Sequence, residues 1–186
     1  MNASSTYGLF VGRFQPFHRG HLDVLRALRR QRPNEPILVG IGSAQESFTW
    51  ENPFTAGERF EMIAHALSEA HLDGVAPVPI ADIHRHALWV AYLESILPRF
   101  GPVYTNNPLT RSLFEDSGHR VESPPLVDRE RLVGRGIRAA LARGESVADR
   151  VPPAVGEWLE AHRASARLRM LRSTEVEEDP ETPDGR

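Results

Sequence analysis

Two residue types are missing from this chain of 186 residues, and each absence removes a class of chemistry. There is no cysteine, so disulfide bonds and thiolate catalysis are excluded, and a cytoplasmic location is expected. Lysine is also absent, because all 22 basic residues other than histidine are arginines. A Schiff-base mechanism and a phosphate-binding loop that ends in lysine are therefore both excluded.

Long apolar runs and a strong net charge are lacking as well. No apolar stretch approaches the length that crosses a bilayer, and residues 1–6 are too polar for a signal peptide, so we expect no membrane association. The net charge is −3, but residues 173–186 carry −5, which leaves the first 172 residues at +2. This weakly basic body suits small anionic ligands and does not indicate a nucleic-acid partner.

Short apolar runs alternate with helical patterns along most of the chain. Strands are expected at residues 7–11, 37–41, 75–80, 103–105 and 120–122, and helices at 20–30, 55–70, 87–97, from 108 onward, 136–143 and 153–164. Thr55 and Glu58 have the spacing of a capping box and mark the start of one helix. This alternation predicts an α/β fold with a doubly wound parallel sheet. In such a sheet, ligands bind beyond the carboxyl ends of the strands.

The chain is expected to form a single domain over residues 1–164. No internal repeat or linker divides this body, and its length suffices for one hydrophobic core. The end of the chain is rich in Glu, Asp, Pro and Thr and lacks the apolar side chains that a core needs. We therefore expect residues 165–186 to be a disordered acidic tail.

The first predicted strand runs directly into the segment Gly12–His21, which reads GRFQPFHRGH. Its two histidines, His18 and His21, flank an Arg-Gly pair and stand where the first helix begins. A helix N-terminus presents unpaired backbone N–H groups and the positive end of the helix dipole, both of which favour phosphate. Gly12 and Gly20 lack a Cβ atom, so a phosphate chain can approach the backbone. The histidine N–H groups could then stabilise charge that develops on phosphate oxygens.

Two other interpretations of the histidine pair are weaker. Most histidine pairs are ordinary surface or core residues, and a zinc site would need a third ligand close by in the sequence. Both histidines follow a strand and open a helix, and a glycine stands at each approach. This placement favours phosphate binding.

The segment from Gly8 to His21 resembles the archaeal-type nicotinamide mononucleotide (NMN) adenylyltransferases, a family within the HxGH nucleotidyltransferase superfamily. Three further blocks resemble the same family in the same order: GSAQ at 42–45 with NPFTAGER at 52–59, DI at 82–83 with ALWV at 87–90, and NNPL at 106–109 with LF at 113–114. The blocks cover most of the chain to about residue 145. The resemblance implies a Rossmann-like α/β fold, often assembled into a homo-oligomer.

The resemblance also implies a role for each matching residue. The catalytic residues would be His18, His21 and Arg138, which contact the phosphates and stabilise the departing pyrophosphate. The nucleotide would be bound by Gly12, Arg13, Phe14, Gln15, Gly20, Asn107, Gly134 and Arg135. The acceptor would be bound by Ser43, His86 and Trp89, with the Trp89 ring stacked on the nicotinamide. Without the resemblance, Trp89 would equally suit a helix core, and Arg138 would be a solvated surface residue.

The implied reaction moves a nucleoside monophosphate from a nucleoside triphosphate onto a phosphate-bearing acceptor and releases pyrophosphate. In this family the substrates are ATP and NMN, and the product is NAD. The acceptor phosphate oxygen is already ionised at neutral pH, so no residue need act as a nucleophile or strong base. Catalysis then depends on positioning and on charge stabilisation by His, Arg and Mg²⁺, which the triphosphate carries without a metal ligand from the chain.

Two regions depart from the family pattern. The last phosphate-binding block usually reads as an aromatic residue, Ser-Gly-Thr, two variable positions and Arg, whereas residues 132–138 read LVGRGIR. Val133 and Arg135 thus replace the two hydroxyl residues, and His86 stands where the family commonly has Asn. Such changes are either neutral or mark a changed nucleotide or acceptor. The alternative enzyme is therefore a CTP-dependent cytidylyltransferase that acts on a small phosphonate or phosphate.

Other functional classes fit less well. A non-catalytic nucleotide sensor is suggested by the altered C-terminal block, but the retained His18 and His21 oppose it. A dinucleotide-binding dehydrogenase is disfavoured, because Gln45 stands where a third glycine would be needed after Gly40 and Gly42.

Overall fold

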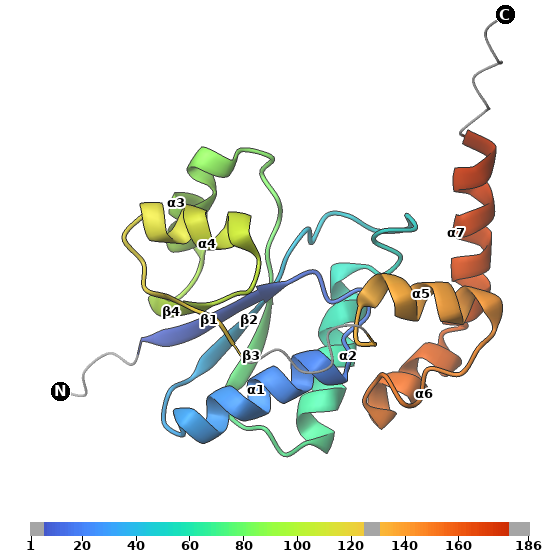
Figure 1. Cartoon of the computed structure of the whole chain (residues 1–186), viewed down its shortest axis with the longest axis horizontal. Coiled ribbons are helices and arrows are strands. Elements are labelled where there is room, and N and C mark those ends of the chain that lie inside the picture. The colour runs from blue at the N-terminus through green and yellow to red at the C-terminus, as the bar shows by residue number, and fades with distance from the viewer. Residues whose placement is uncertain (1–5, 125–130, 179–186) are drawn as a thin grey trace, which may run out of the picture.

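The computed structural model of the chain describes residues 6–124 and 131–178. Within these residues, parallel strands form one sheet in the order β3-β2-β1-β4-β5 (Figure 1). The strands are β1 (Tyr7–Gly12), β2 (Ile37–Ile41), β3 (Val75–Pro79), β4 (Phe100–Tyr104) and β5 (Val121–Glu122). The helices are α1 (Arg19–Gln31), α2 (Ala56–Glu69), α3 (His86–Ile96), α4 (Pro108–Asp116), α5 (Gly134–Arg143), α6 (Pro153–Ala161) and α7 (Ala164–Glu178). The predicted single α/β domain with a doubly wound parallel sheet is confirmed.

Helices cover both faces of the sheet because neighbouring strand residues point to opposite sides. Phe10 and Val39 belong to a core with α1, α2 and the C-terminal helices, whereas Leu9 and Leu38 pack with α3 and α4. Figure 1 shows α1 and α2 on one side of the sheet and α3 and α4 on the other. Every residue of β2, Ile37–Ile41, is buried. Each large apolar side chain buried in this way contributes roughly 1.5–3 kcal/mol.

Two of the helices begin at residues whose side chains cap them. Thr55 and Glu58 form the predicted capping box at α2, with N–H to side-chain distances of 3.2 and 2.8 Å. At α4, the side chain of Asn107 accepts a hydrogen bond from the backbone N–H of Thr110 at 3.0 Å, and Pro108 occupies the first turn. Local sequence therefore positions the start of α4 beside the carboxyl end of β4.

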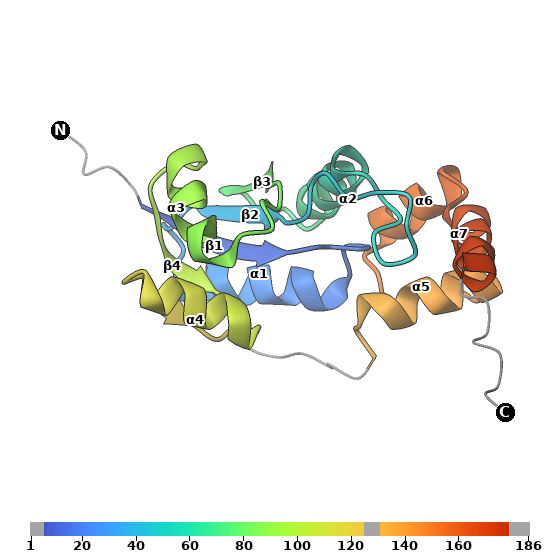
Figure 2. The same ribbon diagram turned by 90° about the horizontal axis from the view of Figure 1, so that it is seen from above.

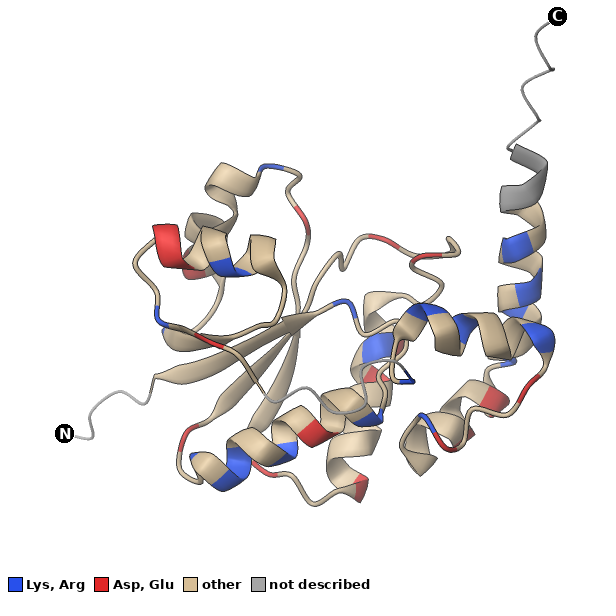
Figure 3. Cartoon of the chain, in the orientation of Figure 1, with Lys and Arg blue, Asp and Glu red and all other residues tan. Residues whose placement is uncertain are grey.

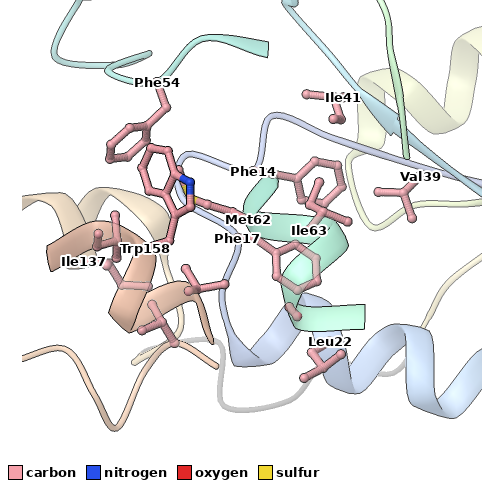
Figure 4. Close-up of a cluster of buried hydrophobic side chains, with 14 of the residues drawn as sticks. Phe14, Phe17, Leu22, Val39, Ile41, Phe54, Met62, Ile63, Ile137 and Trp158 are labelled. Atoms are coloured by element: carbon pink, nitrogen blue, oxygen red, sulfur yellow. The ribbon is translucent and has the colours of Figure 1, made fainter. Parts of the chain in front are cut away.

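The helices α5, α6 and α7 form a C-terminal group beside α2, at the far end of the sheet from α3 and α4 (Figure 2). Trp158 of α6 packs edge-on against Phe54, with ring centroids 6.0 Å apart (Figure 4). Phe14 and Phe17, from the loop between β1 and α1, enter the same core. This core connects the C-terminal helices to the loops that follow β1 and β2.

The structure corrects the predicted C-terminal boundaries. The helix expected over residues 153–164 ends at Ala161, and the chain turns at Arg163, whose φ is 52°. The tail expected to be disordered from residue 165 instead continues as α7 to Glu178. Ala164, Leu168 and Leu171 are all buried, because their spacing places them on one helix face. Residues 179–186 lie outside the described residues.

Other boundaries differ by a few residues. The strand expected at residues 103–105 begins earlier, at Phe100, and α5 begins at Gly134 instead of residue 136. No helix in the described part of the chain combines the length and apolar character needed to span a membrane.

Candidate active site

A pocket of about 390 Å³ opens where β1, β2, β3 and β4 end. β1 and β4 are neighbours in the sheet although β2 and β3 separate them in sequence, so this is the switch point where doubly wound sheets bind ligands. The predicted site residues in its wall are Gly12, Arg13, Ser43, His86, Trp89 and Asn107. The predicted residues outside its wall are Phe14, Gln15, His18, Gly20, His21, Gly134, Arg135 and Arg138.

Helices α3 and α4 and the end of β3 shape one side of this pocket. Trp89 of α3 packs edge-on against Phe114 of α4, with ring centroids 5.5 Å apart, while it also lines the pocket. His86, the first residue of α3, is exposed at the pocket wall. The side chain of Gln45 holds the end of β3, because it accepts from the N–H of Asp82 at 2.8 Å and donates to its carbonyl at 2.9 Å. The aromatic face of Trp89, the imidazole of His86 and the carboxylate of Asp82 thus line the pocket.

The two histidines lie together at the N-terminus of α1. His18 is the N-cap residue and His21 is the third residue of the helix. Their rings stack with centroids 3.5 Å apart, and the backbone N–H of His18 donates to Nδ1 of His21 at 3.2 Å. Because Nδ1 accepts this bond, the proton of a neutral His21 resides on Nε2. The Nε2–H group is then a donor available to a ligand.

Both histidines are neutral at pH 7. Burial lowers the pKa of His18 to about 4. Burial also lowers the pKa of His21 well below its ordinary value, and the neighbouring His18 lowers it further. The rings of Phe14 and Phe17 contribute to this apolar setting, with centroids 4.8 and 5.4 Å from that of His21. The pair can therefore donate hydrogen bonds to phosphate, and the free-energy cost of burying two charged imidazolium groups is avoided.

Gly20 packs tightly against the histidine pair. A Cβ atom at this position would lie 3.2 Å from the His18 ring and 3.4 Å from Cβ of Leu132. The sequence suggested that this glycine leaves open room for phosphate, but the space is filled by protein. Gly20 instead allows the His18 ring to stack under His21.

Arg59 joins the loops that follow β1 and β2. Its side chain is completely buried, and its guanidinium donates four hydrogen bonds to main-chain carbonyls. These carbonyls belong to Arg13, at 2.9 Å, Gly42, at 2.7 Å, Ser43, at 3.0 Å, and Thr55, at 3.2 Å. Burial lowers the pKa of Arg59 to about 10, so the group remains charged at neutral pH. Arg59 therefore fixes two pocket loops relative to each other.

Gln15 and Arg138 connect the histidine loop to the rest of the site. The Gln15 side chain donates to the carbonyl of Phe54 at 2.9 Å and accepts from its N–H at 3.0 Å. Arg138 is buried and donates through Nη1 to the carbonyl of Gln15 at 3.0 Å. A Cβ atom at Gly134 would lie 3.0 Å from the same carbonyl oxygen, so the start of α5 approaches the loop closely only with glycine there.

The predicted residues thus form two adjoining groups. One group lines the pocket, and the other surrounds the N-termini of α1 and α5, where His18, His21, Arg135 and Arg138 lie. Arg135 is exposed on α5, whereas Phe14 and Gln15 are buried and contribute through packing and hydrogen bonds. No group of three or more His, Cys, Asp or Glu side chains among the described residues could hold a metal ion.

Sequence reasoning missed the role of Arg59, although a local signal was present. Arg59 lies on the buried face of α2 with Met62, Ile63 and Ala66. An arginine at a core position of an amphipathic helix needs buried acceptors, and this pattern can be recognised from the sequence. Glu51, which binds Arg138 at 2.8 Å, had no comparable signal because the two residues are 87 positions apart.

Comparisons with known proteins agree on the family. Residues 9–115 match the family model described as cytidylyltransferase-like. The chain is 43% identical over 165 residues to the nicotinamide-nucleotide adenylyltransferase of Thermoplasma volcanium. This alignment covers 89% of this chain and 92% of that protein. The enzyme of the same name from Picrophilus torridus is 43% identical over 165 residues, covering 89% and 96% of the two chains. That of Pyrococcus furiosus is 42% identical over 167 residues and covers 88% of each.

Solved structures support the fold. A bifunctional NMN adenylyltransferase/ADP-ribose pyrophosphatase from Francisella tularensis, complexed with AMP and a manganese ion, aligns with a TM-score of 0.76 at 19% identity. The alignment covers 97% of this chain and 58% of that protein, so this chain spans little more than half of its length.

Proposed function

This chain belongs to the cytidylyltransferase-like family, and we propose that it is a nicotinamide-nucleotide adenylyltransferase. The enzyme transfers the adenylyl group of ATP to the phosphate of NMN and releases pyrophosphate. The observation that carries this proposal is the identity of 42–43% to enzymes of that name over about nine-tenths of the chain. The stacked histidine pair beside a pocket at the sheet switch point supports it.

We propose that the triphosphate binds across the N-termini of α1 and α5. Both helix ends offer unpaired N–H groups and a positive dipole end. His18 and His21 supply imidazole donors at the first, and Arg135 and Arg138 supply guanidinium groups at the second. Arg13 lines the pocket and shares the carboxylate of Glu51 with Arg138, so it can contact the phosphate at which transfer takes place.

NMN occupies the pocket in this proposal. The volume of about 390 Å³ falls within the range of small-ligand sites. The Trp89 ring offers an aromatic face for the nicotinamide, and Ser43 and His86 offer polar groups around it. Gly12 and Asn107, at the ends of β1 and β4, line the route by which the acceptor phosphate reaches the triphosphate.

The chemical step needs no proton transfer to the protein. A phosphate oxygen of NMN forms a bond with the α-phosphorus of ATP while the bond from that phosphorus to the bridging oxygen breaks. Pyrophosphate leaves with the bonding electron pair, and negative charge grows on its oxygens. The Nε2–H group of neutral His21, the imidazole N–H of neutral His18 and the guanidinium of Arg138 stabilise this charge by hydrogen bonding. Mg²⁺ enters with ATP as part of the substrate and neutralises phosphate charge.

Turnover with defined substrates tests the proposal. Pyrophosphate release is measured with ATP or CTP, each paired with NMN or a small phosphonate, in the presence of Mg²⁺. We expect turnover with ATP and NMN, and formation of NAD identified by mass spectrometry. Release of pyrophosphate only in other pairings would refute the NMN adenylyltransferase assignment.

A cytidylyltransferase is the second candidate, because three positions of the site differ from the family pattern. Val133 and Arg135 flank Gly134 at the start of α5, and His86 lines the acceptor pocket. Turnover restricted to CTP, or to a phosphonate acceptor, would support this candidate. Binding of nucleotide without pyrophosphate release in any pairing would instead indicate a nucleotide sensor.

We also propose that the enzyme is a homo-oligomer. Exposed apolar side chains on α3 and α4 support this, because Leu88, Ile96 and Leu109 are each about half exposed. Light scattering on purified protein measures the mass in solution, and a monomeric mass across the working concentration range would contradict the proposal.

A further inference from the structure

A carboxylate occupies the position where two candidate phosphate-binding arginines meet. Oε2 of Glu51 lies 2.8 Å from Nη2 of Arg138 and 3.9 Å from Nη2 of Arg13. Arg138 comes from α5, Arg13 follows β1, and Glu51 lies on the loop between β2 and α2. Figure 3 shows acidic positions on that loop next to the basic positions of α5. One side-chain oxygen of Glu51 thus lies between guanidinium groups from two other segments of the chain.

Arg138 is held inside the protein, whereas the carboxylate of Glu51 is partly open to solvent. Only 3% of the Arg138 side chain is exposed, and its Nη1 is held by the carbonyl of Gln15 at 3.0 Å. Among the described residues its buried Nε has no hydrogen-bond partner. Half of the Glu51 side chain is exposed. The Glu51 side chain can therefore swing out into solvent, while Arg138 stays in place and its N–H groups need another acceptor.

The surroundings make this a site for a more highly charged anion than one carboxylate. A guanidinium presents donors in a rigid fork that matches carboxylate and phosphate oxygens alike. Arg135 lies one turn from Arg138 on α5 and adds positive charge to the same region. With Glu51 in place, a single carboxylate contacts two of these three guanidinium groups, those of Arg138 and Arg13. When Glu51 leaves, the groups that it contacted face the incoming ligand.

We propose that Glu51 is an internal counter-anion of the phosphate site, which the triphosphate displaces on binding and which returns as pyrophosphate leaves. The placement of the triphosphate at Arg13 and Arg138 rests on the proposed function. In this role Glu51 weakens phosphate binding and favours ligands with enough negative charge to displace it. Glu51 is a specificity-determining residue that does not need to touch the reacting atoms.

Two other roles for Glu51 predict different behaviour. A structural ion pair would matter for folding stability and leave the affinity for phosphate unchanged. A ligand to the metal of the nucleotide would make phosphate binding in the presence of Mg²⁺ weaker once the carboxylate is removed. Glu51→Gln separates these roles, because the amide oxygen can still accept a hydrogen bond from Arg138 while the negative charge is lost.

The experiment measures the binding of inorganic tripolyphosphate by calorimetry, with and without Mg²⁺, to the full chain and its Glu51→Gln variant. We expect Kd to fall by about fivefold in the variant, since removal of a carboxylate from a partly exposed arginine pair is worth about 1 kcal/mol. The inhibition constant of pyrophosphate should fall by a similar factor. Glu51→Ala, which removes the side chain altogether, should change both constants in the same direction.

Glu145→Gln is the matched control. Glu145 pairs with Arg143 on the surface and has 49% of its side chain exposed, against 50% for Glu51. The control should bind tripolyphosphate as the unmodified chain does. A Kd for Glu51→Gln within about threefold of the unmodified chain, or any weakening, would overturn the proposal.

This test is independent of the acceptor and of the nucleotide base. Tighter binding in Glu51→Gln would support the counter-anion role even if ATP and NMN gave no turnover, in which case only the proposed function would fail. Turnover with ATP and NMN together with unchanged tripolyphosphate binding would refute the counter-anion role alone.

Discussion

Acidification should destabilise the folded chain in the pH range between the unfolded and folded pKa values of His18. The ring of His18 is buried under His21, and burial lowers its pKa to about 4 in the folded state. In the unfolded chain the same group titrates near its ordinary value of about 6.5. Between these values the unfolded chain binds a proton that the folded chain does not. Unfolding is therefore increasingly favoured as the pH falls.

The sign and size of the effect follow from this difference in proton uptake. The stability contributed by neutral His18 is fully present above about pH 6.5 and is lost progressively as the pH falls toward about 4. The free energy of unfolding changes by at most about 1.4 kcal/mol per pH unit for one histidine, so His18 alone accounts for about 2 kcal/mol between pH 7 and pH 5. His21, whose pKa is also lowered, adds a contribution of the same sign.

Urea unfolding followed by circular dichroism at pH 7 and pH 5 measures the effect. We expect the unmodified chain to lose more free energy of unfolding than His18→Gln over this interval, with a difference of about 2 kcal/mol. His65→Gln, which removes an exposed histidine on α2, should keep the pH dependence of the unmodified chain. An equal loss in His18→Gln and the unmodified chain would refute the conclusion that burial of His18 keeps it neutral.

Three further substitutions test how the site is held together. His21→Ala should lower kcat by about 10² or more with little change in KM for NMN, because it removes the proposed hydrogen-bond donor to the departing pyrophosphate. Near-normal turnover would contradict this role. Arg59→Met should lower the free energy of unfolding by about 3 kcal/mol, because the main-chain carbonyls that Arg59 bridges lose their charged donor. A change below about 1 kcal/mol in a denaturant titration would show that this bridge is dispensable. Gly134→Ala should raise the KM for ATP several-fold more than the KM for NMN, since the Cβ of the alanine would push α5 away from the carbonyl of Gln15. Equal effects on the two KM values would argue against this role of Gly134.

Local sequence patterns determined most of the secondary structure. The apolar run Ile37–Ile41 is buried on both faces, as its composition suggests, and Thr55 and Glu58 form the expected capping box. Helices and buried strands are predictable in this way because their side-chain periodicities involve residues only a few positions apart. The histidine pair at the start of α1 follows from the same local logic.

The ends of elements were less predictable where tertiary packing competes with composition. The acidic residues near the C-terminus suggested disorder from residue 165, yet Leu168 and Leu171 continue α7 because the core beside α5 and α6 buries them. Two leucines in a polar segment are a weak signal. They become decisive only when a complementary surface is present.

The site itself required the tertiary structure. Fourteen site residues were predicted from the sequence. Only the fold separates those that line the pocket, such as Arg13 and Trp89, from those that hold loops in place, such as Gln15. The contact between Arg138 and Gln15 spans 123 positions, and that between Arg138 and Glu51 spans 87. Sequence spacing carries no information about such contacts, because they form only when the switch point of the sheet brings separate loops together. Local chemistry therefore determined which elements form and where the candidate phosphate-binding groups occur, and the sheet decided which of these groups face one another.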